Sequence, residues 1–191
     1  SGRLYLGVAA ATRSEITLRN VPEQELQAFL EVYQKIGGQY QANGGTLEVN
    51  GKRAVQPIAL VETKNYPGFP TDLQAPLMAV LTGAQGRSSI RENIFDQRFG
   101  SAFQMNKMGA DIKIDGNQAV ICGGRPLTGT QVQAGDLRGG AALIIAALMA
   151  EGETCITEAE LINRGYEHIC EDLQALGCRI WQAGSRGFEE L

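Results

Sequence analysis

The sequence repeats one α/β unit of about 70 residues three times, and this repeat limits the possible folds more than any other feature. Each copy begins with a helix of alanine, leucine and other small residues, which favour helix formation and close packing. These three helices are expected at Leu4–Ala11, Leu73–Leu81 and Ala141–Ala150. The copies cover residues 1–65, 66–132 and 133–191 approximately, and together they are expected to form one domain.

A β-type segment and then an amphipathic helix follow in every copy. The first strands are predicted at Glu15–Leu18, Ser88–Ile90 and Thr154–Thr157. The amphipathic helices are predicted at Glu23–Ile36, Arg98–Met108 and Tyr166–Leu176, on the i, i+3, i+4, i+7 spacing of Leu26, Phe29, Leu30 and Tyr33 in the first copy. Later strands are predicted at Ile58–Val61, Ala110–Ile114, Ala119–Ile121 and Cys178–Trp181, with turns at Asn50-Gly51 and Asp115-Gly116.

The order helix, strand, helix, strand, strand predicts a mixed α/β (α+β) fold. Two copies are whole, whereas the third stops soon after Trp181. The stretch 183–187 is too rich in glycine to be expected as a closing strand. We therefore expect a segment outside this sequence to complete the third unit.

Composition excludes several classes of function. A net charge of −4 argues against a general nucleic-acid binder, which needs a basic face. No stretch is apolar over the roughly 20 residues that a membrane helix requires. The four cysteines lack C-x-x-C spacing, and His168 has no second histidine or cysteine at metal-binding distance along the chain, so no metal or other cofactor is expected.

Acids and arginines recur at the predicted helix starts. Asp72 and Asp136 open small-residue helices of two copies, while Arg98 and Arg164 open amphipathic helices. Each cluster alone fits a capped helix or a solvated arginine as well as it fits a site, although a cation is electrostatically misplaced at a helix start. Because equivalent positions meet at one end of a repeat domain, the recurrence favours a site for phosphate or carboxylate.

Several motifs carry a resemblance to a known family. They are YPGFPTDLQ at 66–74, the polar segment Glu92–Phe99, RPLTG at 125–129, DLRGGAA at 136–142 and RGYE at 164–167. In this order they resemble the C-terminal half of the UDP-N-acetylglucosamine enolpyruvyl transferases, also called UDP-N-acetylglucosamine 1-carboxyvinyltransferases. The resemblance covers essentially the whole chain.

The resemblance implies an inside-out α/β barrel of three units, the third completed by the N-terminal segment of the full protein. It also implies transfer of the enolpyruvyl group of phosphoenolpyruvate to the 3-hydroxyl of UDP-N-acetylglucosamine, in the bacterial cytoplasm, for peptidoglycan synthesis. The expected partners are these two substrates and the N-terminal domain that this sequence lacks, with no nucleic acid and no membrane. The chain alone is expected to be inactive.

By the same resemblance, Asp72 accepts the proton of the sugar hydroxyl, and Arg138 and Arg164 hold phosphoenolpyruvate. Arg98 and Ile94 match positions that line the UDP-sugar site, and Asp136 matches an acid that orients the arginines. The family has an acid where this sequence has Asn163, so a neutral hydrogen bond is expected in place of one ion pair.

Two other functions stay open at this point. A non-catalytic half-protein that binds a UDP-sugar or a partner would also keep the arginines, although it would not need Asp72. An enolpyruvyl transferase of the shikimate pathway shares the fold, but the YPGFPTD and RGYE segments count against it.

Overall fold

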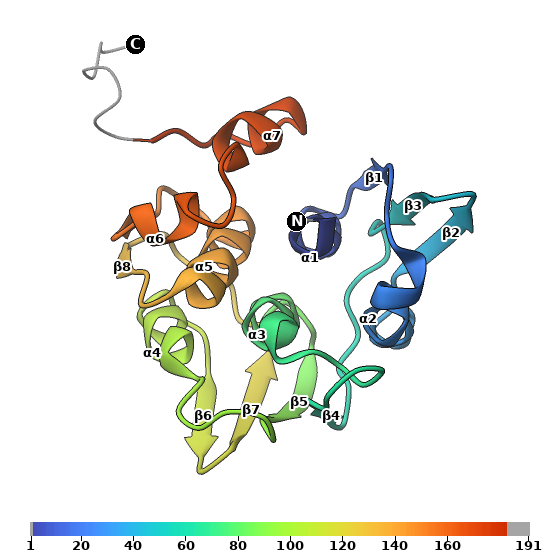
Figure 1. Cartoon of the computed structure of the whole chain (residues 1–191). Coiled ribbons are helices and arrows are strands. Elements are labelled where there is room, and N and C mark those ends of the chain that lie inside the picture. Colours follow the sequence, from blue (N-terminus) through green and yellow to red (C-terminus); the bar gives the residue numbers. More distant parts are fainter. Residues whose placement is uncertain (1, 183–191) are drawn as a thin grey trace.

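Three apolar helices form the centre of the molecule. The computed structural model describes residues 2–182, and in it α1 (Gly2–Thr12), α3 (Gln74–Leu81) and α5 (Leu137–Met149) pack side by side (Figure 1). All eight residues of α3 are buried, as is α5 from Gly139 to Ala146. A helix that is apolar on every side must be surrounded by protein, and small residues allow its neighbours to approach closely.

Three separate sheets lie outside these helices (Figure 1). The first contains β1 (Glu15–Leu18), β2 (Gln39–Asn43) and β3 (Thr46–Asn50), antiparallel in the order β1-β3-β2. The second contains β4 (Val61–Glu62), β5 (Gly86–Arg91), β6 (Ile112–Asp115) and β7 (Gln118–Gly123) in the order β4-β5-β7-β6. Among the described residues, the third contains only β8 (Gln131–Gln133) and β9 (Cys155–Thr157).

The sheets repeat one pattern. In the second and third sheets, a strand that precedes a central helix pairs in parallel with the strand that follows it, β4 with β5 and β8 with β9. In the first and second sheets, the following strand pairs antiparallel with the second strand of a hairpin, β1 with β3 and β5 with β7. The edge of β9 that faces away from β8 has no strand beside it within residues 2–182.

Two glycines mark equivalent close approaches in the first two units. A Cβ atom on Gly51 would lie 2.1 Å from the carbonyl oxygen of Ala9, and one on Gly123 would lie 2.1 Å from that of Ala84. Both glycines stand where a sheet strand ends against the backbone at the end of a central helix. The repeat in sequence is therefore also a repeat in packing.

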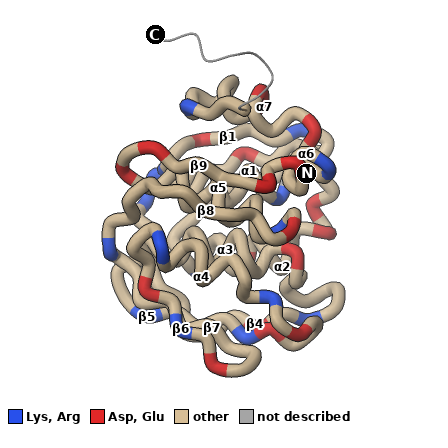
Figure 2. The backbone as a smooth tube through the Cα atoms, turned by 90° about the vertical axis from the view of Figure 1, so that its left-hand side faces the viewer, with Lys and Arg blue, Asp and Glu red and all other residues tan. Residues whose placement is uncertain are grey.

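The second helices and two short helical elements complete the chain. The second helices are α2 (Glu23–Lys35), α4 (Gly100–Lys107) and α7 (Ile169–Ala175). A 3-10 turn, η1 (Thr71–Leu73), leads directly into α3, and α6 (Glu160–Asn163) stands between β9 and α7. Figure 2 shows basic and acidic residues interspersed along the loops around these elements.

Most predicted elements are confirmed, and the mixed α/β fold with them. Differences at the ends have local causes. The helix predicted from Leu73 begins as the η1 turn, and α5 begins at Leu137, four residues before the predicted Ala141, because the side chain of Asp136 caps it. The first hairpin turns at Gly44-Gly45, both with positive φ, and not at Asn50-Gly51, which ends β3.

One predicted strand is shifted and one is wrong. The strand predicted at Ile58–Val61 lies at Val61–Glu62, as β4, and Ile58 to Leu60 are not in a strand. Cys178–Trp181 has the composition of a strand but takes no regular structure, because no other described strand lies beside it to accept its hydrogen bonds. The glycine-rich stretch 183–187 lies outside the described residues. No helix within residues 2–182 is long and apolar enough to cross a membrane.

Candidate active site

An ion pair joins two of the predicted site residues at the starts of neighbouring helices. Arg138 lies in the first turn of α5, and its Nε donates to Oδ1 of Asp72, in η1, at 2.5 Å. Asp136 caps α5, because its Oδ1 accepts from the backbone N–H of Gly139 at 2.7 Å. The equivalent acids Asp72 and Asp136 thus lie at one end of the domain, as the repeat predicted.

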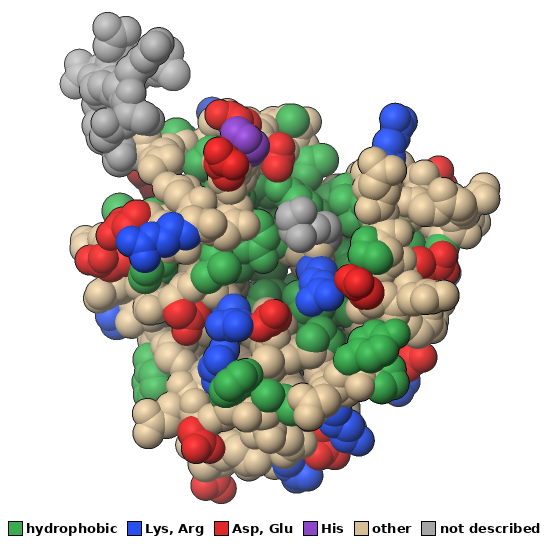
Figure 3. Space-filling model, viewed as in Figure 1, with side chains coloured by type: hydrophobic (Ala, Val, Ile, Leu, Met, Phe, Trp, Pro, Cys, Tyr) green, Lys and Arg blue, Asp and Glu red, His purple; other side chains and the backbone are tan. Residues whose placement is uncertain are grey.

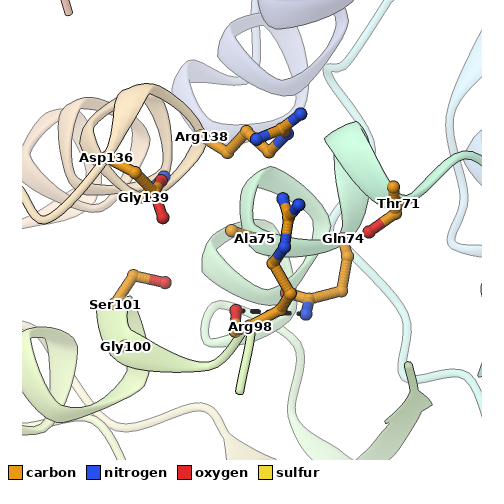
Figure 4. A pocket seen from close by; sticks show the side chains of 9 residues that line it. All are labelled: Thr71, Gln74, Ala75, Arg98, Gly100, Ser101, Asp136, Arg138 and Gly139. Carbon is orange, nitrogen blue, oxygen red and sulfur yellow. Dashed lines mark hydrogen bonds between the residues drawn. The ribbon is translucent and has the colours of Figure 1, made fainter. Parts of the chain in front are cut away.

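A small pocket, open to solvent, lies beside this ion pair (Figure 4). The starts of α3, α4 and α5 all contribute to its wall. Its lining residues are Thr71, Gln74, Ala75, Arg98, Gly100, Ser101, Asp136, Arg138 and Gly139. Figure 3 shows basic and acidic side chains meeting near the middle of this face, above the ends of the central helices.

Buried polar atoms without partners are concentrated at this pocket. Gln74 Oε1, Arg98 Nη1 and Ser101 Oγ are buried, and each lacks a hydrogen-bond partner among the described residues. Buried polar groups in proteins are nearly always satisfied, so three orphans around one pocket indicate a bound molecule or ordered water. Two of these atoms are donors, the Arg98 guanidinium and the Ser101 hydroxyl. They lie beside the start of α4, which has no side-chain cap, and this set of donors suits an anion.

Asp72 keeps one oxygen free. Its side chain is 51% exposed, and Oδ2 has no hydrogen-bond partner within residues 2–182. Tyr166 lies close by: burial raises the pKa of its hydroxyl, the charge of Asp72 raises it further, and Arg3 and Arg138 lower it. The tyrosine is therefore a neutral hydroxyl beside a carboxylate. One Asp72 oxygen is held by an arginine, while the other can accept a proton or a hydrogen bond.

The loop between β5 and α4 carries Arg98 to the pocket. The Arg98 guanidinium carbon lies 4.1 Å from the centre of the Phe95 ring, a cation–π contact that fixes the direction of the side chain. The preceding residue, Gln97, has a φ of +55°, a conformation that only a few per cent of non-glycine residues adopt. Arg98 lies two residues before α4 and not inside it, and its side chain lines the pocket together with Gly100 and Ser101 at the start of that helix.

A family model described as EPSP synthase (3-phosphoshikimate 1-carboxyvinyltransferase) matches residues 1–173. The chain belongs to this enolpyruvyl transferase family. Among the relatives, the UDP-N-acetylglucosamine 1-carboxyvinyltransferase 2 of Clostridium tetani is 46% identical over 178 residues, which is 93% of this chain and 42% of that protein. The UDP-N-acetylglucosamine 1-carboxyvinyltransferase of Desulfofundulus thermocisternus is 42% identical over 94% of this chain and 73% of its own length.

The resemblance drawn from the motifs is therefore confirmed. Solved structures agree on the fold: the enolpyruvyl transferase NikO of Streptomyces tendae matches with a TM-score of 0.82 at 22% identity, over 93% of this chain and 43% of that one. An EPSP synthase of Acinetobacter baumannii matches with a TM-score of 0.72 at 18% identity, over 95% of this chain and 42% of that one. The chain spans less than half the length of most of these proteins.

Some of the predicted site residues line the pocket, and others do not. Arg98, Asp136 and Arg138 line it, and Asp72 is bonded to Arg138. Ile94 lies half-buried in the loop before Arg98.

Arg164 is placed differently from Arg98. It is exposed, does not line this pocket, and its guanidinium has no ion-pair or hydrogen-bond partner within residues 2–182. The prediction that Arg164 opens the third amphipathic helix is wrong, because α6 intervenes: Arg164 follows the last residue of α6, Asn163, and α7 begins only at Ile169. Asn163 is half-buried.

Three further residues were not predicted. Gln74 and Ser101 line the pocket with orphan polar atoms, and Glu92 is a buried carboxylate just after β5. Gln74 occupies the place in its copy that Arg138 has in the third, two residues after the acid, and this correspondence is the signal that could have revealed it.

No group of His, Cys, Asp and Glu side chains suited to a metal occurs in the part of the chain that the structure describes. The four cysteines are free, and His168 is an exposed residue whose Nδ1 lies 3.1 Å from Glu171.

Proposed function

We propose that this chain is the C-terminal half of a UDP-N-acetylglucosamine 1-carboxyvinyltransferase. The full protein would transfer enolpyruvyl from phosphoenolpyruvate to the 3-hydroxyl of UDP-N-acetylglucosamine, in the bacterial cytoplasm, for peptidoglycan synthesis. The chain would form one inside-out α/β barrel domain with units at about 1–65, 66–132 and 133–191. Identities of 40–46% to proteins of that name, over about 93% of the chain, support this choice of acceptor.

The ion pair between Asp72 and Arg138, beside a pocket with a second arginine, is the observation that carries the proposal. The reaction needs an acceptor for the hydroxyl proton and positive charge for an acid substrate. Asp72 supplies the acceptor, because its Oδ2 has no hydrogen-bond partner among residues 2–182, while its Oδ1 is held by Arg138. A carboxylate in this role needs hydrogen-bond reach to the hydroxyl and a fixed orientation.

Arg138 supplies the charge. Only its Nε is engaged by Asp72, so the Nη donors remain for the carboxylate or phosphate of phosphoenolpyruvate. Arg98, with an unpartnered Nη1 on the same pocket, binds the same substrate or the sugar beside it, together with Ile94 of its loop. Arg164 adds a further guanidinium to the phosphoenolpyruvate site, Asp136 orients Arg138 through the start of α5, and Asn163 supports Arg164.

Reactants of this reaction lie between two domains, so one domain provides half of the contacts. We therefore expect the isolated chain to bind UDP-N-acetylglucosamine weakly and to release no phosphate. The N-terminal half of a homologous 1-carboxyvinyltransferase, fused to this chain or added in trans, should restore phosphate release from phosphoenolpyruvate. Release should depend on UDP-N-acetylglucosamine.

Shikimate 3-phosphate is the competing acceptor, because the matching family model is described as EPSP synthase. Both acceptors are offered to the complemented protein. If phosphate is released with shikimate 3-phosphate and not with UDP-N-acetylglucosamine, shikimate 3-phosphate replaces the proposed acceptor. If the complex is folded but neither acceptor leads to phosphate release, the chain is a non-catalytic half-protein.

Asp72→Asn tests the proton acceptor within the same protein. The amide keeps the size of the side chain but cannot take a proton, so we expect turnover to fall by about 10²- to 10⁴-fold with the fold unchanged. Asp115→Asn, at an exposed hairpin end, is the matched control and should keep full turnover. Unchanged turnover in Asp72→Asn would refute the role of Asp72.

A further inference from the structure

Glu92 is a buried carboxylate whose partners are all neutral. Glu92 is 3% exposed, and it takes part in no salt bridge within residues 2–182. A buried charge persists only where hydrogen bonds replace the water it has lost. At Glu92 five donor groups supply such bonds, and the Thr71 hydroxyl is shared between the two carboxylate oxygens.

The first group of bonds reaches the segment that carries Asp72. Oε1 accepts from Thr63 Oγ1 at 2.9 Å, and Thr71 Oγ1 lies 3.0 Å from both carboxylate oxygens. Thr71 is the first residue of η1 and the direct neighbour of Asp72. Oε2 also accepts from Gln74 Nε2 at 3.4 Å, at the first residue of α3.

The second group reaches the loop that carries Arg98. Oε1 accepts from the backbone N–H groups of Ile94 at 3.1 Å and Phe95 at 3.3 Å. Phe95 in turn supports the Arg98 guanidinium through its ring. The Gln74 amide closes the connection, because the same Nε2 donates to the carbonyl oxygen of Arg98 at 3.3 Å.

One carboxylate therefore ties both sides of the pocket together. We propose that Glu92 is a positioning residue that sets Asp72 and Arg98 at a fixed separation across the candidate site. This proposal rests on the proposed function, in which Asp72 and Arg98 contact the reactants. Glu92 does not line the pocket and acts only through Thr71, Gln74 and the loop.

Glu92→Gln removes this bridge with little change in volume. One acceptor oxygen becomes an NH₂ donor. If the new amide keeps its oxygen towards the backbone N–H groups of Ile94 and Phe95, its NH₂ group faces the Gln74 Nε2 donor, and if it turns round, the NH₂ group faces those backbone N–H groups. Either orientation loses hydrogen bonds on one side of the bridge, so the loop or the segment of η1 and α3 is held less firmly. Thr71→Val is the second, milder variant, because it removes one donor and keeps the shape. Glu48→Gln, an exposed strand residue, is the matched control.

The first readout needs no substrate. In the NMR spectrum of this chain, the Nε–H signal of Arg138 reports directly on its bond to Asp72 Oδ1. We expect this signal to shift in Glu92→Gln and to shift less in Thr71→Val, and the amides of Ile94 and Phe95 to exchange at least tenfold faster in Glu92→Gln. Glu48→Gln should change neither. If the Ile94 and Phe95 amides exchange faster but the Arg138 Nε–H signal keeps its position in both variants, Glu92 only stabilises the loop locally, and the proposal is overturned.

The second readout is turnover per folded site in the complemented protein. Misplacement of Asp72 and Arg98 should lower kcat at least tenfold in Glu92→Gln, after correction for the folded fraction, while KM for phosphoenolpyruvate rises less. A loss that the folded fraction explains in full would also overturn the proposal. If wild type itself is inactive after complementation, the proposed function fails, and the NMR comparison still decides whether Glu92 positions these two residues.

Discussion

Single polar atoms distinguish the functional end of this molecule from the rest of it. Five buried side-chain atoms lack hydrogen-bond partners among the described residues, and three of them face one pocket. The other two are Tyr33 Oη and Thr154 Oγ1. An orphan inside a core lowers stability with no compensating gain, whereas orphans around a pocket stay available for a ligand.

Tyr33→Phe tests this difference at a position away from the pocket. Tyr33 is 1% exposed, its ring stacks on Phe29 at 6.3 Å between centroids, and its hydroxyl is unpartnered. Removal of the hydroxyl keeps the ring packing and removes a buried polar group that has lost its water without gaining a hydrogen bond. We therefore expect the free energy of unfolding to rise by about 1 kcal/mol and Tm by about 2–4 °C. A calorimetric Tm at pH 7 measures this, and a clear decrease would mean that the hydroxyl has an unrecognised partner.

The same variant has a defined pH dependence. Burial raises the pKa of Tyr33 from 10.0 to about 12. Below pH 10 the hydroxyl is neutral in both states. Between pH 10 and 12 it ionises only in the unfolded chain, so the wild type loses stability there. The stability advantage of Tyr33→Phe should therefore grow from pH 10 to 12, as urea unfolding at each pH would record, and a constant advantage would contradict the pKa shift.

Residue by residue, the sequence predicts charged site groups better than neutral ones. Asp72 and Asp136 recur at equivalent helix starts, so the repeat itself brings them to one end of the domain, and Arg138 follows Asp136 by two residues. Gln74 and Ser101 look like ordinary helix residues, and their role follows only from which buried atoms remain unpaired. The role of Glu92 depends on partners up to 29 residues distant, which no local pattern reveals.

At the scale of elements, the ends of helices decide where the site groups lie. The side chain of Asp136 accepts from Gly139 N–H and starts α5 at Leu137, so Arg138 falls in its first turn. Sequence periodicity finds the apolar middle of this helix but not its start, because Gly139 and Gly140 in the first turn have little helix propensity. In the third unit, α6 displaces Arg164 from the place that Arg98 holds in the second.

Asp136→Ala measures the cap of α5. Loss of the acceptor leaves the Gly139 N–H without its partner, and we expect a cost of about 1 kcal/mol and a fall in Tm of about 2–4 °C. Asp136→Asn keeps a cap oxygen and should retain most of the stability. Equal Tm values for both variants would show that charge, and not the cap hydrogen bond, is what α5 requires.

At the scale of the whole molecule, the three units differ most in their sheets. The second sheet has four strands, while the third consists of two strands of three residues each. In the ladder with β8, Cys155 N–H donates to Thr130 O at 3.1 Å, and Thr157 O accepts from Ala134 N–H at 3.0 Å. The amide and carbonyl of Ile156, between them, therefore face the opposite edge of β9, because alternate residues of a strand bond to opposite neighbours.

The edge of β9 that has no strand beside it within residues 2–182 gives the last prediction. In the first two units the equivalent strands β1 and β5 are paired at this edge by β3 and β7, so a strand of the complementing N-terminal half should pair with β9 here. Hydrogen exchange of the Ile156 amide should then slow at least tenfold when that half binds, while the Cys155 amide, already bonded to Thr130, changes much less. An active complex in which Ile156 exchanges as fast as in the isolated chain would mean that the two halves join elsewhere, and that the third unit functions with its sheet edge open.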